Sequence, residues 1–212
     1  KGALTVALAL TAAGAAWVTT RRPVGTLRYA IGVIGVILLG RLALNPTVVA
    51  GDPGSLPGLN WLLWGYGVPA VAFAAASILL RRQRDDQVVA LSEALALIFA
   101  WLLVSFEIRH AVNGALDTRA PGHVEAGLQV FATLGFAVGL LRLEALRRSL
   151  VLRLATYVFG FMGLAGAVAG LMILDNPLVD SSERVYGGLV LNSLLPGYLL
   201  PALAAILLGR WA

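Results

Sequence analysis

Hydrophobic residues occur along the chain in long, nearly unbroken runs. Seven runs approach or exceed the roughly 20 residues that a helix needs to cross the hydrocarbon core of a bilayer: residues 2–19, 24–44, 61–80, 88–110, 124–141, 150–174 and 186–208. Unpaired backbone groups are excluded from lipid, so an apolar run of this length is expected to be helical. The pattern predicts an all-α fold, a polytopic transmembrane helix bundle of about seven spans.

One polar and aromatic stretch occurs twice, at the start of the third run and at the start of the seventh. Residues 59–70 read LNWLLWGYGVPA and residues 191–202 read LNSLLPGYLLPA, with eight identities in twelve positions at an offset of 132 residues. Spans three and seven run in the same direction, which predicts a parallel internal repeat with its axis along the membrane normal. Residues 1–122 then form a first four-helix repeat. Residues 123–212 supply three helices of an incomplete second copy, which we expect to continue beyond Ala212.

The composition places this pattern in a membrane. The chain is 59% hydrophobic and only 13% charged, with a mean hydropathy of +0.85, whereas soluble domains carry about 25% charged residues. The net charge of +5 therefore indicates cytoplasmic loops and not nucleic-acid binding. The absence of cysteine excludes disulfides and thiolate metal sites. We expect the lipid bilayer, a lipid or glycolipid ligand and other membrane proteins as partners.

The distribution of arginine between the loops predicts the orientation. One set of loops holds eight arginines, and the other holds two arginines among five acidic residues. The first set is Arg21, Arg22, Arg81, Arg82, Arg84, Arg142, Arg147 and Arg148; the second is Arg119 and Arg184 with Asp52, Asp117, Asp175, Asp180 and Glu183. Positive loops stay inside, so we predict a multi-pass protein of the bacterial inner membrane with its N-terminus outside and its C-terminus in the cytoplasm.

The repeated motif has two interpretations. Gly65 and Gly67 permit close helix approach and Pro69 invites a kink, which favours a helix-packing role. Repeat-related sites also often bind substrate near the symmetry axis, so the motif can instead form a polar pocket near the outer face, with paired hydrogen-bonding groups from Asn60, Tyr66, Asn192 and Tyr198. Asn60 and Tyr66 are six residues apart and do not share a face of a regular helix, so this pocket requires an irregular first turn.

Ionisable residues cluster at the outer ends of spans two and four. A charge inside a span is costly and often functional. Arg41 lies one turn from the end of span two, and SFEIRH near the end of span four supplies Glu107, Arg109 and His110. Arg41 and Glu107 form a natural ion pair if these spans touch, and all four residues are candidates for substrate contact or simple interfacial exposure. Glu93, nearer the inner end, is expected beside Arg81–Arg84.

Metal, cofactor and catalytic motifs are weakly represented. Glu107 and His110 have the E-x-x-H spacing that lets both side chains face one metal, but His123 and Glu125 are two residues apart and diverge on a helix. We therefore predict no metal site. No phosphate-binding loop or serine-hydrolase motif occurs, so no cofactor is expected. Glu107 is the leading candidate for a catalytic base, with Asp52 and Asp175 as alternatives.

The motifs LNP, GLNWLLWGYGVPA and SFEIRH together resemble the bacterial membrane proteins catalogued as domain of unknown function 2339. The resemblance implies a polytopic inner-membrane protein, part of a longer chain with many more spans, and it supplies no activity or catalytic residue. The second motif copy departs from the first at Pro196, which stands where the first has Trp64. A strict two-fold site is therefore not expected.

Three functions follow from these observations. The leading hypothesis is a membrane protein that binds a lipid-linked or polar envelope substrate at its outer face, as a transporter or flippase component or an accessory subunit. The second is an integral-membrane transferase acting on lipid-linked sugars, with an outward acidic base. The third is a structural scaffold whose polar groups bind no ligand.

Overall fold

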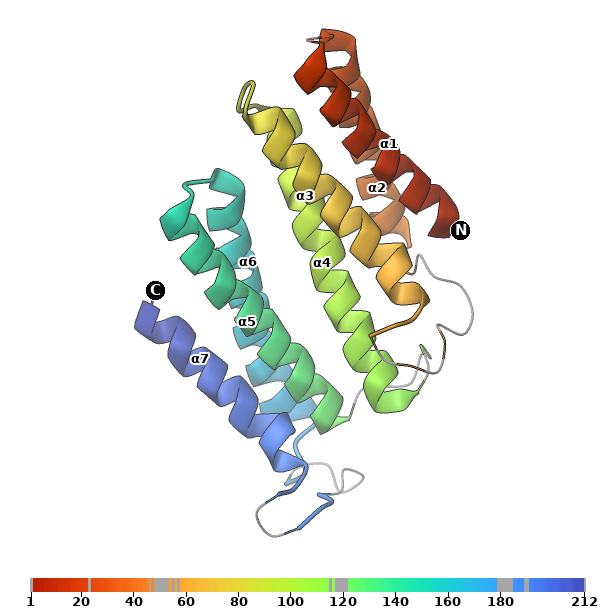
Figure 1. Ribbon diagram of the computed structural model, residues 1–212. Helices are drawn as coiled ribbons and strands as arrows, with labels where there is room; N and C mark the ends of the chain where they lie inside the picture. Colours follow the sequence, from red (N-terminus) through yellow and green to blue (C-terminus); the bar gives the residue numbers. More distant parts are fainter. Residues whose placement is uncertain are drawn as a thin grey trace. The chain divides into compact units, whose positions relative to one another are not determined.

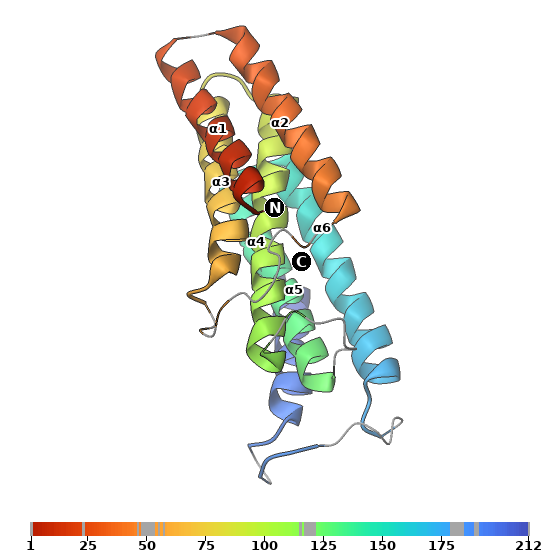
Figure 2. The same cartoon turned by 90° about the vertical axis from the view of Figure 1, so that its right-hand side faces the viewer.

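The computed structural model of the protein describes residues 2–22, 24–45, 47, 54, 56, 58–114, 116, 122–178, 185–188 and 191–211 (Figures 1 and 2). The described residues are helical apart from loops and one isolated β-bridge between Gly187 and Asn192. The all-α fold class is confirmed. The chain divides into two compact units, unit 1 (Lys1–His110) and unit 2 (Ala111–Ala212).

Unit 1 contains helices α1 to α4. Their bounds are α1 Gly2–Arg21, α2 Gly25–Leu44, the π-helical turn η1 Leu63–Gly67 leading into α3 Val68–Arg81, and α4 Gln87–Asn113, whose last turn passes the unit boundary. Helix α1 packs against α2 and α3. Its buried face includes Ala9, Ala12 and Ala16, all fully buried. These small side chains allow the neighbouring backbones to approach closely, as is usual in membranes.

Helix α4 occupies the space between α2 and α3 (Figure 2). On the α2 side, a Cβ added at Gly35 would lie 2.7 Å from a methyl group of Leu91 on α4. On the α3 side, the ring of Phe73 stacks on Phe99 of α4 with centroids 6.2 Å apart. An alanine at position 35 would therefore require the Leu91 side chain to shift.

Two buried or part-buried ion pairs hold the arginine-rich end of unit 1. Arg28 of α2 donates from Nε to Asp86 (2.8 Å) and from Nη2 to the carbonyl oxygen of Arg84 (2.6 Å). Arg81 of α3 donates from Nη2 to Glu93 of α4 at 2.8 Å. Glu93 thus lies beside the Arg81–Arg84 segment.

The Asp86 carboxyl lies in the loop before α4 and its pKa is held below the ordinary value. The hydrogen bond from Arg28 is the largest cause, and partial burial opposes it. The backbone amides of Val88 and Val89 also donate to Asp86 and lower the pKa further. Asp86 is therefore the charged N-cap of α4. The dipole of the helix makes a negative charge favourable at this end.

Unit 2 contains α5 to α7. Their bounds are α5 His123–Leu146, α6 Leu150–Ala165 continued by the π-helical segment η2 Gly166–Leu174, and the π-helical turn η3 Leu195–Leu199 leading into α7 Leu200–Trp211. Helix α5 packs against both α6 and α7. A Cβ added at Gly127 of α5 would lie 2.4 Å from the Cα of Gly197. The two backbones are therefore in direct contact at this crossing.

Six of the seven predicted spans coincide with helices long and apolar enough to cross a membrane: Gly2–Arg21, Gly25–Leu44, Leu63–Arg81, Gln87–Asn113, His123–Leu146 and Leu150–Leu174. The seventh apolar helix, Leu195–Trp211, is shorter, so the predicted start at residue 186 is wrong. Gly187 has φ +113° and pairs with Asn192 in the isolated bridge. A helix cannot include that conformation, which glycine adopts readily.

Much of the outer surface of the helices is apolar. Large side chains that are more than half exposed include Tyr29 (78%) and Val36 (62%) on α2 and Phe161 (74%) on α6. Soluble monomers rarely expose contiguous apolar patches of more than a few hundred Å². The exposed faces suit contact with lipid and agree with a multi-pass membrane protein; which end faces the cytoplasm stays a prediction.

The two copies of the repeated motif form the same local structure. The Oδ1 atom of Asn60 accepts a hydrogen bond from the Leu62 amide at 2.8 Å, and that of Asn192 accepts one from the Leu194 amide at 3.0 Å. A π-helical turn follows each asparagine and leads into the α-helix. The two motif copies thus share a local geometry, while the parallel internal repeat itself stays a prediction. The repeat boundary at residue 122 stays a prediction, while the compact units divide after His110.

Proline explains why these turns are π-helical. Pro69 and Pro201 stand at the second position of α3 and α7, and a proline ring in a regular helix clashes with the carbonyl four residues earlier. In the wider π-turn the Val68 amide donates to the carbonyl oxygen of Leu63, five residues back. The widened turn gives the proline ring room without ending the helix.

Candidate functional site

The candidate site lies in unit 1, where the segment before α3 contacts the last turns of α4. Asn60 is 8% exposed. Its Oδ1 accepts from the Leu62 amide, which fixes the orientation of the side-chain amide. The Nδ2 group is thereby directed toward α4. One asparagine thus both caps the start of span three and reaches span four.

The hydrogen-bond partner of this side-chain amide is Glu107 of α4. Its Oε2 atom accepts a hydrogen bond from Nδ2 of Asn60 at 3.0 Å and a second from the backbone amide of Gly58 at 2.9 Å. Gly58 has φ +84°, a left-handed conformation that favours glycine. The carboxylate therefore fastens the loop before α3 to the end of α4.

The other oxygen of the same carboxylate differs in its hydrogen bonding. Glu107 Oε1 is buried and has no hydrogen-bond partner among the residues that the structure describes. A buried acceptor without a donor costs about 1–3 kcal/mol, and more when it is charged. The site therefore holds one carboxylate oxygen in place, while the second has no donor among the described residues.

His110 completes the cluster one turn further along α4. It is 3% exposed, and its Nδ1 lies 3.4 Å from Nδ2 of Asn60. Nδ2 carries two hydrogens and also lies 3.3 Å from the carbonyl oxygen of Leu56, so it cannot donate fully to every neighbour. If Nδ1 accepts from Asn60, the imidazole proton sits on Nε2. The cluster thus joins a carboxylate and an imidazole through one amide.

An apolar cavity adjoins Asn60. It has a volume of about 400 Å³ and is lined by Asn60 together with Gly54, Leu59, Trp61, Leu63 and Trp64. The two tryptophans are 65% and 60% exposed, a position suited to the membrane–water interface. An apolar recess therefore lies directly beside the polar cluster.

The remaining predicted residues of unit 1 lie around this cluster. Tyr66 is 1% exposed, and its ring packs against Phe99 and Phe106 with centroids 6.4 and 5.2 Å apart. The irregular first turn required by the pocket hypothesis is present as η1. Arg109 is two residues from Glu107 on α4, so its side chain leaves the helix in another direction.

The predicted ion pair between Arg41 and Glu107 is not among the salt bridges within the described part of the chain, which join Arg28 and Arg84 to Asp86 and Arg81 to Asp85 and Glu93. The hydrogen bonds that Glu107 accepts there come from Gly58 and Asn60. The carboxylate is already engaged by its neighbouring loop.

In unit 2 the motif tyrosine makes contacts that its counterpart in unit 1 is not shown to make, whereas the motif asparagine caps its helical segment as in unit 1. The hydroxyl of Tyr198 donates to the carbonyl oxygens of Leu171 (3.0 Å) and Asp175 (3.2 Å), at the end of η2. Asn192 caps the helical segment that follows it. Tyr198 and Asn192 thus make contacts within unit 2, and Asp175 follows the last residue of η2; their role in substrate binding stays a prediction. Asp52 lies outside the described residues, as do Asp117, Arg119, Asp180, Glu183 and Arg184.

Sequence reasoning missed several polar contacts. His123 Nε2 lies 2.9 Å from Ser193 Oγ, and Asn113 donates to Glu125 at 2.8 Å. The histidine and the glutamate are both 2% exposed. Ser193 follows the motif asparagine directly, and that adjacency is the one sequence signal that could have linked it to a buried partner. Among the described residues, no group of three or more His, Asp or Glu side chains is arranged to hold a metal.

The model of the family described as "Predicted membrane protein (DUF2339)" matches residues 1–212, the whole chain. This match confirms the resemblance drawn from the sequence motifs. No curated protein and no solved structure matches the chain.

Proposed function

The chain belongs to the DUF2339 family of predicted membrane proteins, and from this premise we propose that it binds a lipid-linked or polar envelope substrate at the outer end of unit 1. The substrate group that we propose carries a hydroxyl or an amine, because the site offers an acceptor. The protein then acts as a transporter or flippase component, or as an accessory subunit.

One observation carries the proposal: Glu107 Oε1 is buried without a hydrogen-bond partner among the described residues. Oε2 of the same carboxylate is held by Gly58 and Asn60, so the group is already oriented before a ligand arrives. A donor from a ligand would remove the cost of the unpaired oxygen. Charge-assisted hydrogen bonds of this kind contribute about 1.5–3 kcal/mol.

The apolar cavity beside Asn60 supports an amphiphilic ligand. Leu59, Trp61 and Trp64 line it and are exposed, so an acyl or prenyl chain could rest there while its polar head reaches Glu107. Lipid-binding sites combine such an apolar recess with few polar groups. A ligand with only a polar head would leave the recess unused.

The orientation of unit 1 supports an outer-face location. The site lies at the end of α4 that is remote from Arg81, Arg82 and Arg84, which follow or end α3. The positive-inside rule assigns the arginine end to the cytoplasm. The ligand would then come from the outer leaflet or from the space beyond it.

A second candidate function, a transferase acting on lipid-linked sugars, is favoured by the same unpartnered oxygen. Glu107 Oε1 could accept the proton of an acceptor hydroxyl during its attack, as a general base does. This role adds turnover to binding. Glu107→Gln would then abolish turnover while sparing folding, and unchanged turnover would remove Glu107 from the mechanism.

Native mass spectrometry of the full-length protein in mild detergent tests the binding proposal. The wild type should retain a specific lipid or glycolipid, and Glu107→Gln should lose it by a factor of about ten or more, which corresponds to at least 1.4 kcal/mol. Glutamine keeps the size of the side chain and its acceptor oxygen. Asn60→Asp, which keeps the cap acceptor but loses the donor, should lose the ligand as well.

Glu125→Gln is the matched control. Glu125 is also buried on a helix and accepts a hydrogen bond from an asparagine, Asn113, in unit 2. This variant should retain the ligand at the wild-type level. Equal retention by Glu107→Gln, or a wild type that carries no specific ligand, would overturn the proposal and favour a scaffold.

A further inference from the structure

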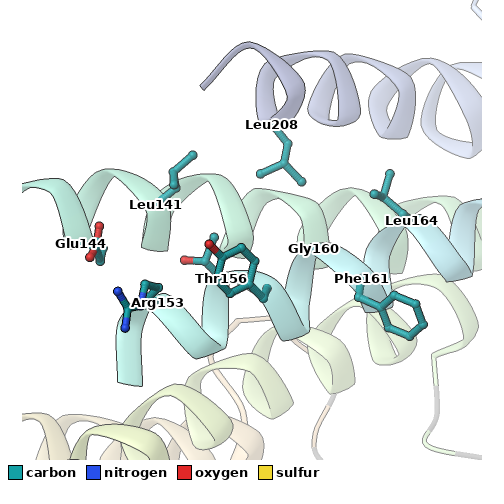
Figure 3. Close-up of a pocket in the computed structure, with 9 residues that line it drawn as sticks. Leu141, Glu144, Arg153, Thr156, Gly160, Phe161, Leu164 and Leu208 are labelled. Atoms are coloured by element: carbon teal, nitrogen blue, oxygen red, sulfur yellow. The ribbon is translucent and has the colours of Figure 1, made fainter. Parts of the chain in front are cut away.

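Unit 2 carries a groove between α6 and α7, with α5 behind it (Figure 3). Its volume is about 400 Å³. Glu144 and Arg153 lie toward one end, Gly160 and Leu208 line its middle, and Phe161 lies toward the other end. We call this the α6–α7 groove. It is distinct from the candidate site of unit 1.

The helices that form this groove have counterparts in unit 1. Residues 26–35 at the start of α2 read TLRYAIGVIG, and residues 151–160 of α6 read VLRLATYVFG. At a constant offset of 125 residues (153 − 28) five positions are identical: Leu27 and Leu152, Arg28 and Arg153, Ala30 and Ala155, Val33 and Val158, Gly35 and Gly160. In both units the arginine is in the first turn and the last matched glycine is two turns later.

In unit 1 a helix fills the equivalent position. Helix α4 lies between α2 and α3: Arg28 binds Asp86 just before its first residue, and Gly35 receives the side chain of Leu91. The first unit therefore consists of three helices and a fourth that sits over the arginine and the glycine.

The groove of unit 2 has the same arginine and glycine without such a helix, and Leu208 of α7 lies 3.6 Å from the position of a Cβ added at Gly160. The side chains of Arg153 and Glu144 have neither a hydrogen bond nor a salt bridge among the residues that the structure describes, although the backbone amide of Arg153 donates to the carbonyl oxygen of Ser149. Glu144 stands 125 residues after Thr19, whose hydroxyl accepts a hydrogen bond from Gln83 in the loop before α4 at 3.2 Å. Both polar positions that face the start of α4 in unit 1 thus recur at one end of the groove.

We propose that the α6–α7 groove seats a fourth transmembrane helix, supplied by the segment of the parent chain that follows residue 212. In unit 1 the filling helix follows the third helix after residues 82–86, and α7 is the third helix of unit 2. This inference goes beyond the proposed function of unit 1.

The geometry of unit 1 specifies the chemistry of this helix. An Asp or Glu at its N-cap faces Arg153, as Asp86 faces Arg28. A large aliphatic side chain five residues later, at the spacing from Asp86 to Leu91, packs against Leu208, which lies over Gly160 in the middle of the groove. A hydrogen-bond donor three residues before the acid faces Glu144, as Gln83 faces Thr19.

Site-specific photo-crosslinking in native membranes tests this proposal on the full-length protein. A benzophenone amino acid replaces Tyr157, which lines the groove and is 68% exposed. The matched control carries the probe at Val158, which is 53% exposed and does not line the groove. The Tyr157 probe should give an intramolecular adduct with a peptide that follows residue 212, and the Val158 probe should not.

Other adducts at Tyr157 would overturn the proposal. A phospholipid adduct would make the groove a lipid site, and an adduct with another protein or a second copy would make it an intermolecular surface. The absence of any protein adduct would show that no helix is seated there.

Charge reversal provides the second measurement. Arg153→Glu should reduce the Tyr157 adduct at least fivefold, and replacing the acid of the captured segment by arginine should restore it. Arg148→Glu, in the neighbouring loop, should leave the yield unchanged. An Arg153→Glu variant that crosslinks at the wild-type level, or a swap that restores nothing, would refute the pairing of Arg153 with an acidic N-cap.

Discussion

Replacing Gly127 by alanine tests the backbone contact between α5 and the turn before α7. The added Cβ would lie 2.3 Å from the carbonyl oxygen and 2.4 Å from the Cα of Gly197. Neither neighbouring atom belongs to a side chain that can rotate away. The helices must therefore separate by about 1 Å to restore an ordinary van der Waals distance.

The cost follows from this geometry. Overpacking that shifts a backbone costs about 1–3 kcal/mol, while the glycine-to-alanine change itself favours a helix by about 0.5–1 kcal/mol. Gly135→Ala on the same helix is the matched control, because nothing lies within 4 Å of its added Cβ. The difference between the two variants removes the helix-propensity contribution. We expect Gly127→Ala to be less stable than Gly135→Ala by about 1–3 kcal/mol.

Thermal unfolding in detergent, followed by tryptophan fluorescence, measures this difference. Gly197→Ala should fall between the two variants, because its Cβ would lie 3.2 Å from Cδ2 of His123, a side-chain atom that can shift, and 3.3 Å from the carbonyl oxygen of the same residue. Equal midpoints for Gly127→Ala and Gly135→Ala would refute the contact between α5 and η3.

Three further predictions concern the polar contacts of the two units. Glu93→Gln should destabilise unit 1 by about 1–3 kcal/mol, because it removes the buried carboxylate that Arg81 binds at 2.8 Å and leaves only the exposed Asp85 as an anionic partner; chemical denaturation measures the loss. Because the pKa of Asp86 is lowered in the folded protein, its contribution to stability is complete above the ordinary pKa of the carboxyl and is lost as pH falls through the lowered value. Arg28→Gln should therefore flatten the acid dependence of the unfolding midpoint in melts recorded from neutral to acidic pH. Tyr198→Phe removes a hydroxyl that donates to two backbone carbonyls and should cost about 0.5–1.5 kcal/mol in thermal unfolding.

Controls for these predictions come from exposed positions of the same chain. Asp85→Asn removes a carboxylate that is 68% exposed and pairs with Arg81 at 3.7 Å, so it should change stability by less than about 1 kcal/mol. Tyr29→Phe removes a hydroxyl from a side chain that is 78% exposed and should be nearly neutral. A loss in either control as large as in Glu93→Gln or Tyr198→Phe would contradict the burial argument.

The spans were predictable because hydropathy and length alone decide which segments can cross a bilayer. The seventh helix begins later than predicted because the apolar residues near Tyr186 are interrupted by Gly187, whose positive φ belongs to a turn. Hydropathy registers glycine as neutral and does not register its conformation. The π-turns were foreseen only as an irregularity near Pro69.

The residues of the candidate site were predictable from the sequence, but the hydrogen bonds between them were not. Asn60, Glu107 and His110 were all candidates, yet charge alone paired Glu107 with Arg41. The structure instead brings a neutral amide to the carboxylate, together with the backbone amide of Gly58. Backbone donors leave no signature in a sequence, since every residue except proline carries one. The position of the loop before α3 along α4 decides which donor reaches the carboxylate of Glu107.

The π-turns at the start of α3 and α7 also affect where these helices can bend. A helix bends most easily where its hydrogen-bond ladder is interrupted, and Pro69 and Pro201 each deprive a carbonyl of the preceding turn of its usual amide. Each of these two α-helices is thus rigid along its length and is linked to its capping asparagine by a more flexible π-turn. In unit 1 the π-turn links Asn60, and through it Glu107, to the rest of α3. Amide exchange should accordingly be fastest in these turns, with the α-helices beyond them remaining protected.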